Sequence, residues 1–270
     1  MSEAIDKACS NAQMGEKIGD RAKIENFLGF RTDGKKSRLP ARLDFLQSAT
    51  GLILGLFMWG HMLFVSTVLI SPEFYEKTAR FFEGSTIFDS PSPALVSCMV
   101  LIILIIFFLH AGLGMRKLPI SWRQYQITRE HAKLIKHGDT SLWLIQASTG
   151  FIMFFLGSIH LGMMLFMSES IGIEGSSTRI VHYHMWAFYL ILLFAVELHG
   201  GIGLYRLCVK WGWFDGKSVH DARKRRITLK RLKWAISVFF IALGIANLAV
   251  FIKVGIKSGN YAALWQAVLS

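Results

Sequence analysis

The sequence predicts an all-α membrane protein built as a bundle of five transmembrane helices. The chain has 270 residues, of which 53% are hydrophobic, and its mean hydropathy is +0.42. A soluble domain of this length has more charge and shorter apolar runs. Five apolar windows are each close to the roughly 20 residues that a helix needs to cross about 30 Å of hydrocarbon. These windows are residues 52–70, 94–115, 142–167, 185–204 and 234–252.

The basic residues predict on which side of the membrane each loop lies. Of the 30 lysines and arginines, 9 lie in residues 1–42, 6 in 116–139 and 10 in 206–233, which leaves 5 for all other segments. Rich and poor segments alternate, so the positive-inside rule predicts a cytoplasmic N-terminus and an outer C-terminus. The net charge of +12 is therefore interpreted as a topology signal and a cytoplasmic docking face, with no nucleic acid as partner.

Three segments are expected along the chain. Residues 1–37 form a polar cytoplasmic segment, residues 38–257 the transmembrane domain and residues 258–270 a short tail outside the membrane. The polar N-terminal segment contains no short apolar core followed by a cleavage site, so we expect the first helix to insert the chain. The three cysteines fall on separate elements without CxxC spacing, which predicts neither a disulfide framework nor a cysteine metal site.

Local signals predict the ends of the first two helices. The first helix begins near Arg42, and an outer loop follows over residues 71–93. At the end of this loop, Ser92 and Pro93 are a suitable N-cap and first-turn pair for the second helix. That helix is expected to end at Arg116, where charged residues begin.

The remaining three helices are predicted in the same way. Asp139 or Thr140 can cap the third helix. The fourth helix is expected to begin after a short outer loop that reads SSTRIV. The fifth window, WAISVFFIALGIANLAVFI, contains no ionisable residue, which predicts a helix used only for packing.

Four of the nine histidines lie inside apolar windows, one on each of the first four helices. At 1.5 Å per residue, His61 and His160 lie about 12–15 Å from the outer ends of their helices, and His110 and His199 about 9–11 Å from the inner ends. The depths therefore predict an outer pair and an inner pair. A single intramembrane histidine is often a structural hydrogen-bonding group, but each one costs energy in hydrocarbon unless its ring nitrogens have partners.

Two imidazoles at one depth on two helices match the axial positions of a haem iron. Zinc prefers three or four converging ligands, and each pair offers two. Glycines lie beside all four histidines, where a flat macrocycle requires backbone without side chains, although close helix packing is the alternative explanation. The prediction is two stacked b haems, with His61 and His160 on the outer iron and His110 and His199 on the inner iron.

The haem propionates need cationic or hydrogen-bonding partners at the rims of the membrane. Candidates at the inner helix ends are Gln47, Ser48, Trp143 and Lys210, and the outer candidate is Arg179. Each of these side chains is also suited to anchor a helix at the interface or to snorkel. Arg179 is the most informative, because the positive-inside bias disfavours a basic residue in its loop.

Four long stretches resemble the dihaem cytochrome b subunit of bacterial quinol:fumarate reductases. They read RLPARLDFLQSATGLILGLFMWGHMLFVST, HAGLGMRKLPISWRQY, HGDTSLWLIQASTGFIMFFLGSIHLGMM and FAVELHGGIGLYRLCVKWGWFDG. The likeness extends over roughly residues 38–257. It implies a subunit of the bacterial inner membrane with a periplasmic C-terminus, in which His61 and His160 hold the distal haem and His110 and His199 the proximal haem.

The resemblance implies a role in anaerobic respiration. The chain would oxidise menaquinol near the periplasmic side and pass electrons through the distal and then the proximal haem to an iron–sulfur subunit. A flavoprotein subunit would reduce fumarate, so FAD and the iron–sulfur clusters would belong to partners on the cytoplasmic face. This chain would contact menaquinol and membrane lipid but not fumarate, and a dimer of heterotrimers is compatible with the resemblance.

The resemblance also assigns residues to the quinol site and the propionates. The quinol-site glutamate corresponds to Glu83 in ARFFEGS, which by residue type alone would be a solvated loop carboxylate. A carboxylate beside a quinol hydroxyl can accept the proton as the electron leaves. His182 and His184 in VHYHMW depart from the family pattern, which concerns the quinone pocket. The implied propionate partners are Gln47, Ser48, Trp143 and Lys210 for the proximal haem and Arg179 for the distal haem.

Glu197 lies two residues from His199 and therefore points to a different side of the fourth helix. Electrons that move inward from an outer quinol move against a potential worth about 2.3 kcal/mol per charge for each 100 mV. A proton carried inward through Glu197 would cancel this charge movement, as the resemblance implies. The alternative is a protonated glutamate that bonds a neighbouring helix.

Three other functions remain open from the sequence. The same subunit in a succinate dehydrogenase would reduce menaquinone, because histidines and topology do not set the direction of electron flow. The b-type cytochromes of hydrogenases and formate dehydrogenases place two ligands on one helix, whereas each histidine here has its own. A haem-free transporter or anchor would use the histidines to handle protons, and a reduced-minus-oxidised spectrum would distinguish it.

Overall fold

The computed structural model describes residues 38–258 except 89, 120, 136–137 and 215–217. The described residues form helices joined by short connections and contain no strand. The expectations for the N-terminal segment and for residues 259–270 lie outside this part of the chain.

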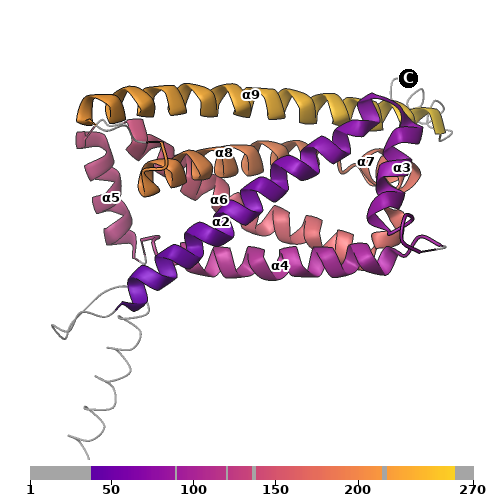
Figure 1. Ribbon diagram of the computed structural model, residues 1–270, viewed down its shortest axis with the longest axis horizontal. Coiled ribbons are helices and arrows are strands. Elements are labelled where there is room, and N and C mark those ends of the chain that lie inside the picture. Colours follow the sequence, from indigo (N-terminus) through magenta and orange to yellow (C-terminus); the bar gives the residue numbers. More distant parts are fainter. Residues whose placement is uncertain (1–37, 89, 120, 136–137, 215–217, 259–270) are drawn as a thin grey trace, which may run out of the picture.

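Five of the helices are long and apolar enough to span a membrane, which confirms the predicted fold class. The five helices are α2 (Leu39–Val65), continued by the 3-10 turn η1 (Ser66–Leu69), α4 (Pro93–Met115), α6 (Gly138–Phe166), α8 (Trp186–Trp211) and α9 (Val219–Ser258). Figure 1 shows α8 and α9 alongside each other and α2 crossing the bundle diagonally.

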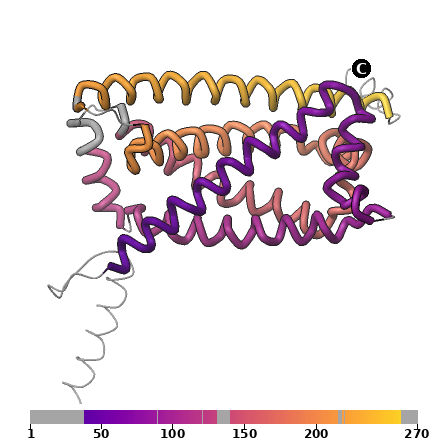
Figure 2. The backbone as a smooth tube through the Cα atoms, viewed as in Figure 1, coloured from indigo at the N-terminus to yellow at the C-terminus, as the bar shows by residue number. Residues whose placement is uncertain are grey.

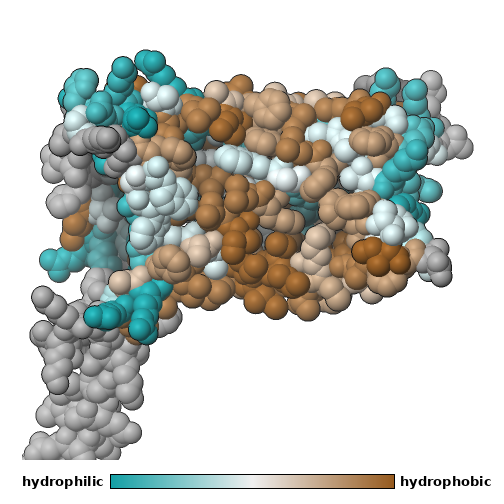
Figure 3. Space-filling model, in the orientation of Figure 1, coloured by the Kyte–Doolittle hydropathy of each residue, from teal (hydrophilic) through white to brown (hydrophobic). Residues whose placement is uncertain are grey.

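The five helices form one bundle with an apolar middle. Figure 2 shows α2 crossing the bundle diagonally, in contact with α4 and α8. α6 lies against both α4 and α8, and α9 runs along α8. Figure 3 shows a broad hydrophobic band between two hydrophilic ends, as expected for a protein whose middle faces lipid.

Shorter helices close the two ends of the bundle (Figure 1). α5 (Trp122–Ile135) lies at the end where α2 begins. At the other end lie α3 (Pro72–Phe82), the 3-10 turn η2 (Ser168–Ser170) and α7 (Ile173–Val181). The expectation of outer loops was therefore wrong in two places, because residues 72–82 of the expected 71–93 loop and the whole SSTRIV stretch are helical.

The sequence around α3 explains why a helix forms there. Ser71 is the N-cap, and its hydroxyl oxygen accepts the backbone N–H of Phe74 at 3.0 Å. Pro72 follows at the first turn, where it costs no hydrogen bond. Polar and apolar residues then alternate with helical periodicity, so α3 can lie across the end of the bundle with one face packed.

Two predicted helix starts differ from the structure in detail. Ser92 is the N-cap of α4 as predicted, but its side chain makes no capping hydrogen bond. α6 begins at Gly138, so Asp139 and Thr140 lie in its first turn and are not the cap. α8 ends at Trp211, and the C-cap Gly212 that follows has a left-handed φ of 63°, which suits glycine.

The fifth helix extends well beyond its apolar window. α9 has 40 residues and begins at Val219, whereas the apolar window begins at Trp234. At 1.5 Å per residue such a helix is about 60 Å long, roughly twice the thickness of the hydrocarbon core. Hydropathy detects only the part in lipid, so the basic first turns escaped the prediction.

Candidate functional site

The structure brings the four intramembrane histidines together as two pairs. The rings of His61 on α2 and His160 on α6 have centroids 6.2 Å apart. The rings of His110 on α4 and His199 on α8 have centroids 6.3 Å apart. These are the two pairs that the depth calculation predicts.

In each ring of the inner pair, Nδ1 makes a hydrogen bond to a neighbouring helix. His199 Nδ1 lies 2.8 Å from the carbonyl oxygen of Gln146, which can only accept, so this nitrogen donates. His110 Nδ1 lies 3.1 Å from the Thr50 hydroxyl oxygen, and that hydroxyl donates to the Leu46 carbonyl at 2.8 Å. The Thr50 oxygen therefore accepts from His110. In both rings the lone pair is left on Nε2, as metal-ligating histidines require.

Two glycines let the inner histidine rings lie directly against neighbouring backbone. A Cβ on Gly51 of α2 would be 2.8 Å from Cε1 of His110. A Cβ on Gly150 of α6 would be 2.7 Å from both Cε1 and Nδ1 of His199. We call Gly51 and Gly150 the glycine seats. The sequence argument considered the glycines next to the histidines on the same helix and missed these two, which lie on other helices.

The outer pair is less enclosed by protein. His61 is exposed on the surface of the chain and stacks on Phe57, with centroids 5.8 Å apart. His160 packs against Tyr189 at 5.7 Å, and its buried Nδ1 has no hydrogen-bond partner among the described residues. An imidazole in hydrocarbon needs cover and partners for its nitrogens, so both rings fit a site that a bound group completes.

The geometry of both pairs fits one metal ion between two imidazoles. With a metal–nitrogen bond of about 2 Å on each side, two imidazoles on one ion have ring centres about 6 Å apart. Among the described residues, no group of three or more histidine, cysteine or carboxylate side chains could hold a metal ion. A two-ligand site is typical of haem, whose macrocycle supplies the other four ligands.

The inner ends of α2 and α8 bring two of the predicted propionate partners together. Lys210 Nζ donates to the Ser48 hydroxyl at 2.9 Å. Lys210 also forms an ion pair with Asp44, which in turn pairs with Lys117. Sequence reasoning missed Asp44, because a carboxylate at the start of a basic helix looks like an ordinary interfacial residue. An anion bound at Lys210 would therefore compete with Asp44.

The other two inner candidates lie in the same region. The buried Oε1 of Gln47 has no partner among the described residues and can accept a hydrogen bond. Trp143 lines a cavity of about 440 Å³ together with Lys210 and Arg206. Arg206 donates to the side-chain oxygen of Gln146 at 2.8 Å.

Arg179 is buried on α7 and does not lie in an open loop. Its Nη1 donates to the Ser170 carbonyl at 2.8 Å, and its Nη2 donates to the Ser176 hydroxyl at 3.1 Å. Its Nε is buried without a partner among the described residues. The guanidinium therefore anchors α7 to η2 and keeps one donor for a further acceptor.

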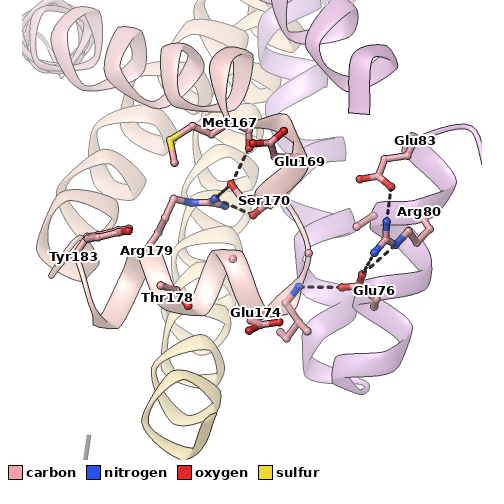
Figure 4. Close-up of a pocket in the computed structure, with 14 residues that line it drawn as sticks. Glu76, Arg80, Glu83, Met167, Glu169, Ser170, Glu174, Thr178, Arg179 and Tyr183 are labelled. Carbon is pink, nitrogen blue, oxygen red and sulfur yellow. Dashed lines mark hydrogen bonds and ion pairs between the residues drawn. The ribbon is translucent and has the colours of Figure 1, made fainter. Parts of the chain in front are cut away.

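Glu83 is 3% exposed at the end of α3, which replaces the expectation of a solvated loop carboxylate from residue type alone. Its Oε2 accepts from Arg80 Nη1 at 3.0 Å. Both residues line a cavity of about 520 Å³ between α3, η2 and α7, drawn in Figure 4. Arg179 lines the same cavity, so two of the predicted site residues meet there.

Tyr75 helps to hold the helices around this cavity. Its hydroxyl donates to the Ile171 carbonyl at 2.8 Å and lies 3.4 Å from the Ser176 hydroxyl. Burial raises the pKa of Tyr75, so its hydroxyl keeps the proton with which it donates. α3 is thus fixed to the segment between η2 and α7 by a bond that sequence reasoning did not predict.

Glu197 is 1% exposed and faces α2 and α9, away from the histidine on its own helix. Its Oε2 accepts from Trp59 Nε1 at 3.4 Å. Ser237 and Lys233 lie near its Oε1. Within the described part of the chain, Glu197 Oε1, Ser237 Oγ and Lys233 Nζ are buried without a hydrogen-bond partner, and Lys233 Nζ lies over the Trp234 ring. Lys233 precedes the fifth apolar window by one residue, which is why the sequence reading treated that helix as packing only.

His182 and His184 are exposed beside the outer cavity and do not enter it. The ring of His182 lies 5.1 Å from that of Tyr183, which does line the cavity. His184 has a φ of 54°, so it serves the tight turn between α7 and α8.

Comparison with known proteins relates this arrangement to one family. The model of the succinate dehydrogenase/fumarate reductase transmembrane subunit matches residues 122–244. The chain is 54% identical over 235 residues to the fumarate reductase cytochrome b subunit of Helicobacter pylori, which is 87% of this chain and 89% of that one. It is 50% identical over 234 residues to the fumarate reductase cytochrome b subunit of Wolinella succinogenes, covering 87% and 90%. The chain therefore belongs to the succinate dehydrogenase/fumarate reductase transmembrane subunits, among the cytochrome b subunits of fumarate reductase.

Proposed function

We propose that this chain oxidises menaquinol at the outer side of the bacterial inner membrane and delivers electrons to the cytoplasmic side. There an iron–sulfur subunit and a flavoprotein subunit, which carry iron–sulfur clusters and FAD, would use them to reduce fumarate. The N-terminus would be cytoplasmic and the C-terminus periplasmic, in line with the distribution of lysine and arginine. A dimer of such heterotrimers is part of the proposal.

One observation carries the proposal: two histidine pairs lie on four different helices with ring centroids 6.2 and 6.3 Å apart. This separation suits two b haems, held by His61 with His160 and by His110 with His199. When bound, the two haems would carry single electrons across the thickness of the membrane. Hydrogenase and formate dehydrogenase cytochromes are disfavoured, because they place two haem ligands on one helix, whereas each histidine here lies on a helix of its own.

The rims offer donors for the propionates of such haems. At the inner rim, Lys210 and Ser48 form one cluster, with Gln47 and Trp143 in the same region. At the outer rim, Arg179 keeps one buried donor unpaired within the described residues. These contacts support the proposed propionate partners by charge and placement at the helix ends.

Glu83 is proposed as the group that accepts the proton of the quinol. Its carboxylate is buried, lines the outer cavity and has one oxygen fixed by Arg80. A general base needs a fixed direction and reach toward the proton that it removes. The cavity lies at the end of the bundle nearer the outer histidine pair, which suits transfer of the electron to that side.

The direction of turnover in the cell follows from the partners and not from this chain. The matching family includes succinate dehydrogenases as well as fumarate reductases. Run in reverse, the same site would reduce menaquinone with electrons from succinate, and Glu83 would then return a proton to the quinone.

The purified complex with both partner subunits tests the proposal. We expect two b-type haems per copy of this chain in a reduced-minus-oxidised spectrum, and reduction of fumarate by a water-soluble reduced naphthoquinone. A complex that contains no haem, or that reduces fumarate from a viologen dye but never from the naphthoquinol, would contradict the proposed function.

Glu197→Gln is expected to lower quinol-dependent fumarate reduction strongly in sealed membranes. Glu197 is proposed to carry a proton inward, which offsets the cost of about 2.3 kcal/mol per electron for each 100 mV. Glutamine keeps the shape and the Trp59 contact but carries no acidic proton. Activity is measured in vesicles with a membrane potential and haem content is checked in parallel. Wild-type activity in the variant would remove the relay from the proposal.

Gly150→Ala is expected to weaken binding of the inner haem. The new methyl group would be 2.7 Å from two atoms of the His199 ring, so the ring has to move. Overpacking of this kind typically costs about 1–3 kcal/mol. The outer haem of the same variant is the internal control, because its proposed ligand His160 lies ten residues further along α6. Haem retention during purification is the measurement, and equal retention of the two haems would contradict the expectation.

A further inference from the structure

One arginine of α3 binds two carboxylates of the same helix at the edge of the outer cavity. Arg80 Nη1 donates to Glu83 Oε2 at 3.0 Å. Its Nε and Nη2 both lie 3.1 Å from Glu76 Oε1. The spacings of three and four residues put these side chains on one face of the helix, and Figure 4 shows the guanidinium between the two carboxylates.

Glu76, the second carboxylate that Arg80 binds, is itself hydrogen-bonded to another helix. Glu76 Oε2 accepts the backbone N–H of Ile173, the first residue of α7, at 3.0 Å. The residue before it is Gly172, where a Cβ would lie 2.7 Å from the same oxygen. A carboxylate at a helix N-terminus is favoured by the unpaired N–H groups and the helix dipole. Glu76 therefore holds Arg80 at a fixed place relative to α7.

Glu83 is buried, whereas Glu76 and Arg80 are partly exposed to solvent. The Glu83 side chain is 4% exposed, whereas those of Glu76 and Arg80 are 34% and 52% exposed. An exposed ion pair alone contributes little to stability. A buried carboxylate, in contrast, needs a charged or hydrogen-bonding partner, and Arg80 supplies it from the solvent side.

We propose that Arg80 is a positioning residue for quinol oxidation, which holds one oxygen of Glu83 so that the other stays available to the quinol hydroxyl. This inference rests on the proposed role of Glu83. Glu76 braces Arg80 against α7, which also carries Arg179, so the contact chain links both candidate groups of the cavity. The other charged groups that line the cavity are Glu169 of η2 and Glu174 of α7.

Arg80→Met in the complete complex tests the proposal. We expect kcat for fumarate reduction by a reduced naphthoquinone to fall on the order of 10-fold, because misdirected reacting groups slow the chemical step. KM should change less than about twofold, since the proposal assigns Arg80 no contact with the quinol. Haem content and viologen-driven fumarate reduction, which bypasses the quinol site, should stay at the wild-type level. A purely structural role would lower these two readouts together with kcat.

Two further variants separate the charge from its geometry. Arg80→Lys keeps the cation but cannot bind both carboxylates with a planar fork, so its kcat should lie between those of Arg80→Met and wild type. Lys77→Met removes an exposed cation from the same helix and should leave kcat unchanged. If Arg80→Met loses haem, Arg80→Lys is used in its place, provided that it keeps the native haem content. A lowered kcat with unchanged viologen-driven activity then supports the proposal, and an unchanged kcat contradicts it.

Parallel measurement of Glu83→Gln distinguishes the two ways in which the account can fail. A Glu83→Gln complex with wild-type quinol activity overturns the proposed base and, with it, the role of Arg80. An inactive Glu83→Gln complex beside an Arg80→Met complex with unchanged kcat overturns only the positioning role. A lowered kcat in both variants, with haem and viologen activity intact, supports the proposal.

Discussion

Replacing any one of the four intramembrane histidines by alanine is expected to remove one of the two proposed haems and to abolish the proposed quinol-dependent reduction of fumarate. Each proposed iron site would keep only one of the two imidazoles that would hold it, because alanine has no side chain that can bind a metal. Variants of His61 and His160 should lose the same spectral component, and variants of His110 and His199 the other. The measurement is haem content per chain, with reduced-minus-oxidised spectra resolved by redox titration.

The most specific part of this expectation is which two histidine variants lose the same haem. His182→Ala is the matched control, because His182 is exposed outside the bundle, and it should keep both components. If His61 and His110 variants lost the same component, the pairs inferred from the ring distances of 6.2 and 6.3 Å would not be the ligand pairs.

Glu83→Gln is expected to slow quinol oxidation by about 100-fold or more, the usual range for loss of a general base. Glutamine still accepts a hydrogen bond from Arg80 but cannot take the quinol proton. Haem content and viologen-driven fumarate reduction should not change. The rate of fumarate reduction by a reduced naphthoquinone is the measurement.

A second carboxylate of the same cavity provides the control for Glu83. Glu174 lines the cavity but is exposed, so Glu174→Gln should behave like wild type. Equal loss of activity in the two variants would indicate that the cavity needs negative charge in general and no specific base.

The membrane part of the fold could be predicted from the sequence because hydropathy and length decide it. Five apolar windows correspond to five spanning helices, and the depth of each histidine in its window was enough to anticipate which rings meet. The depth of a residue can be predicted because the hydrocarbon thickness fixes the position of a spanning helix along the membrane normal. The fold class therefore followed from local properties of the chain.

The ends of the bundle could not be predicted in the same way. α3 and α7 are polar enough to look like loops, and only their packing across the bundle gives them a buried face. The contacts that matter there join distant parts of the chain, such as Glu76 with the N-terminus of α7. Asp44 and Lys233 were missed for a related reason, since each lies outside the apolar windows and gains its significance from a side chain on another helix.

At the glycine seats, Gly51 and Gly150, a mutation can impair the histidine pair without impairing insertion of the chain into the membrane. A methyl group at either position adds apolar surface, so the insertion machinery would still accept the helix and the chain would reach its normal topology. The same methyl group would crowd His110 or His199. A substitution at either position would therefore leave the amount of protein in the membrane unchanged while it weakens the proposed haem site, so the abundance of the protein would not report how much of it is functional.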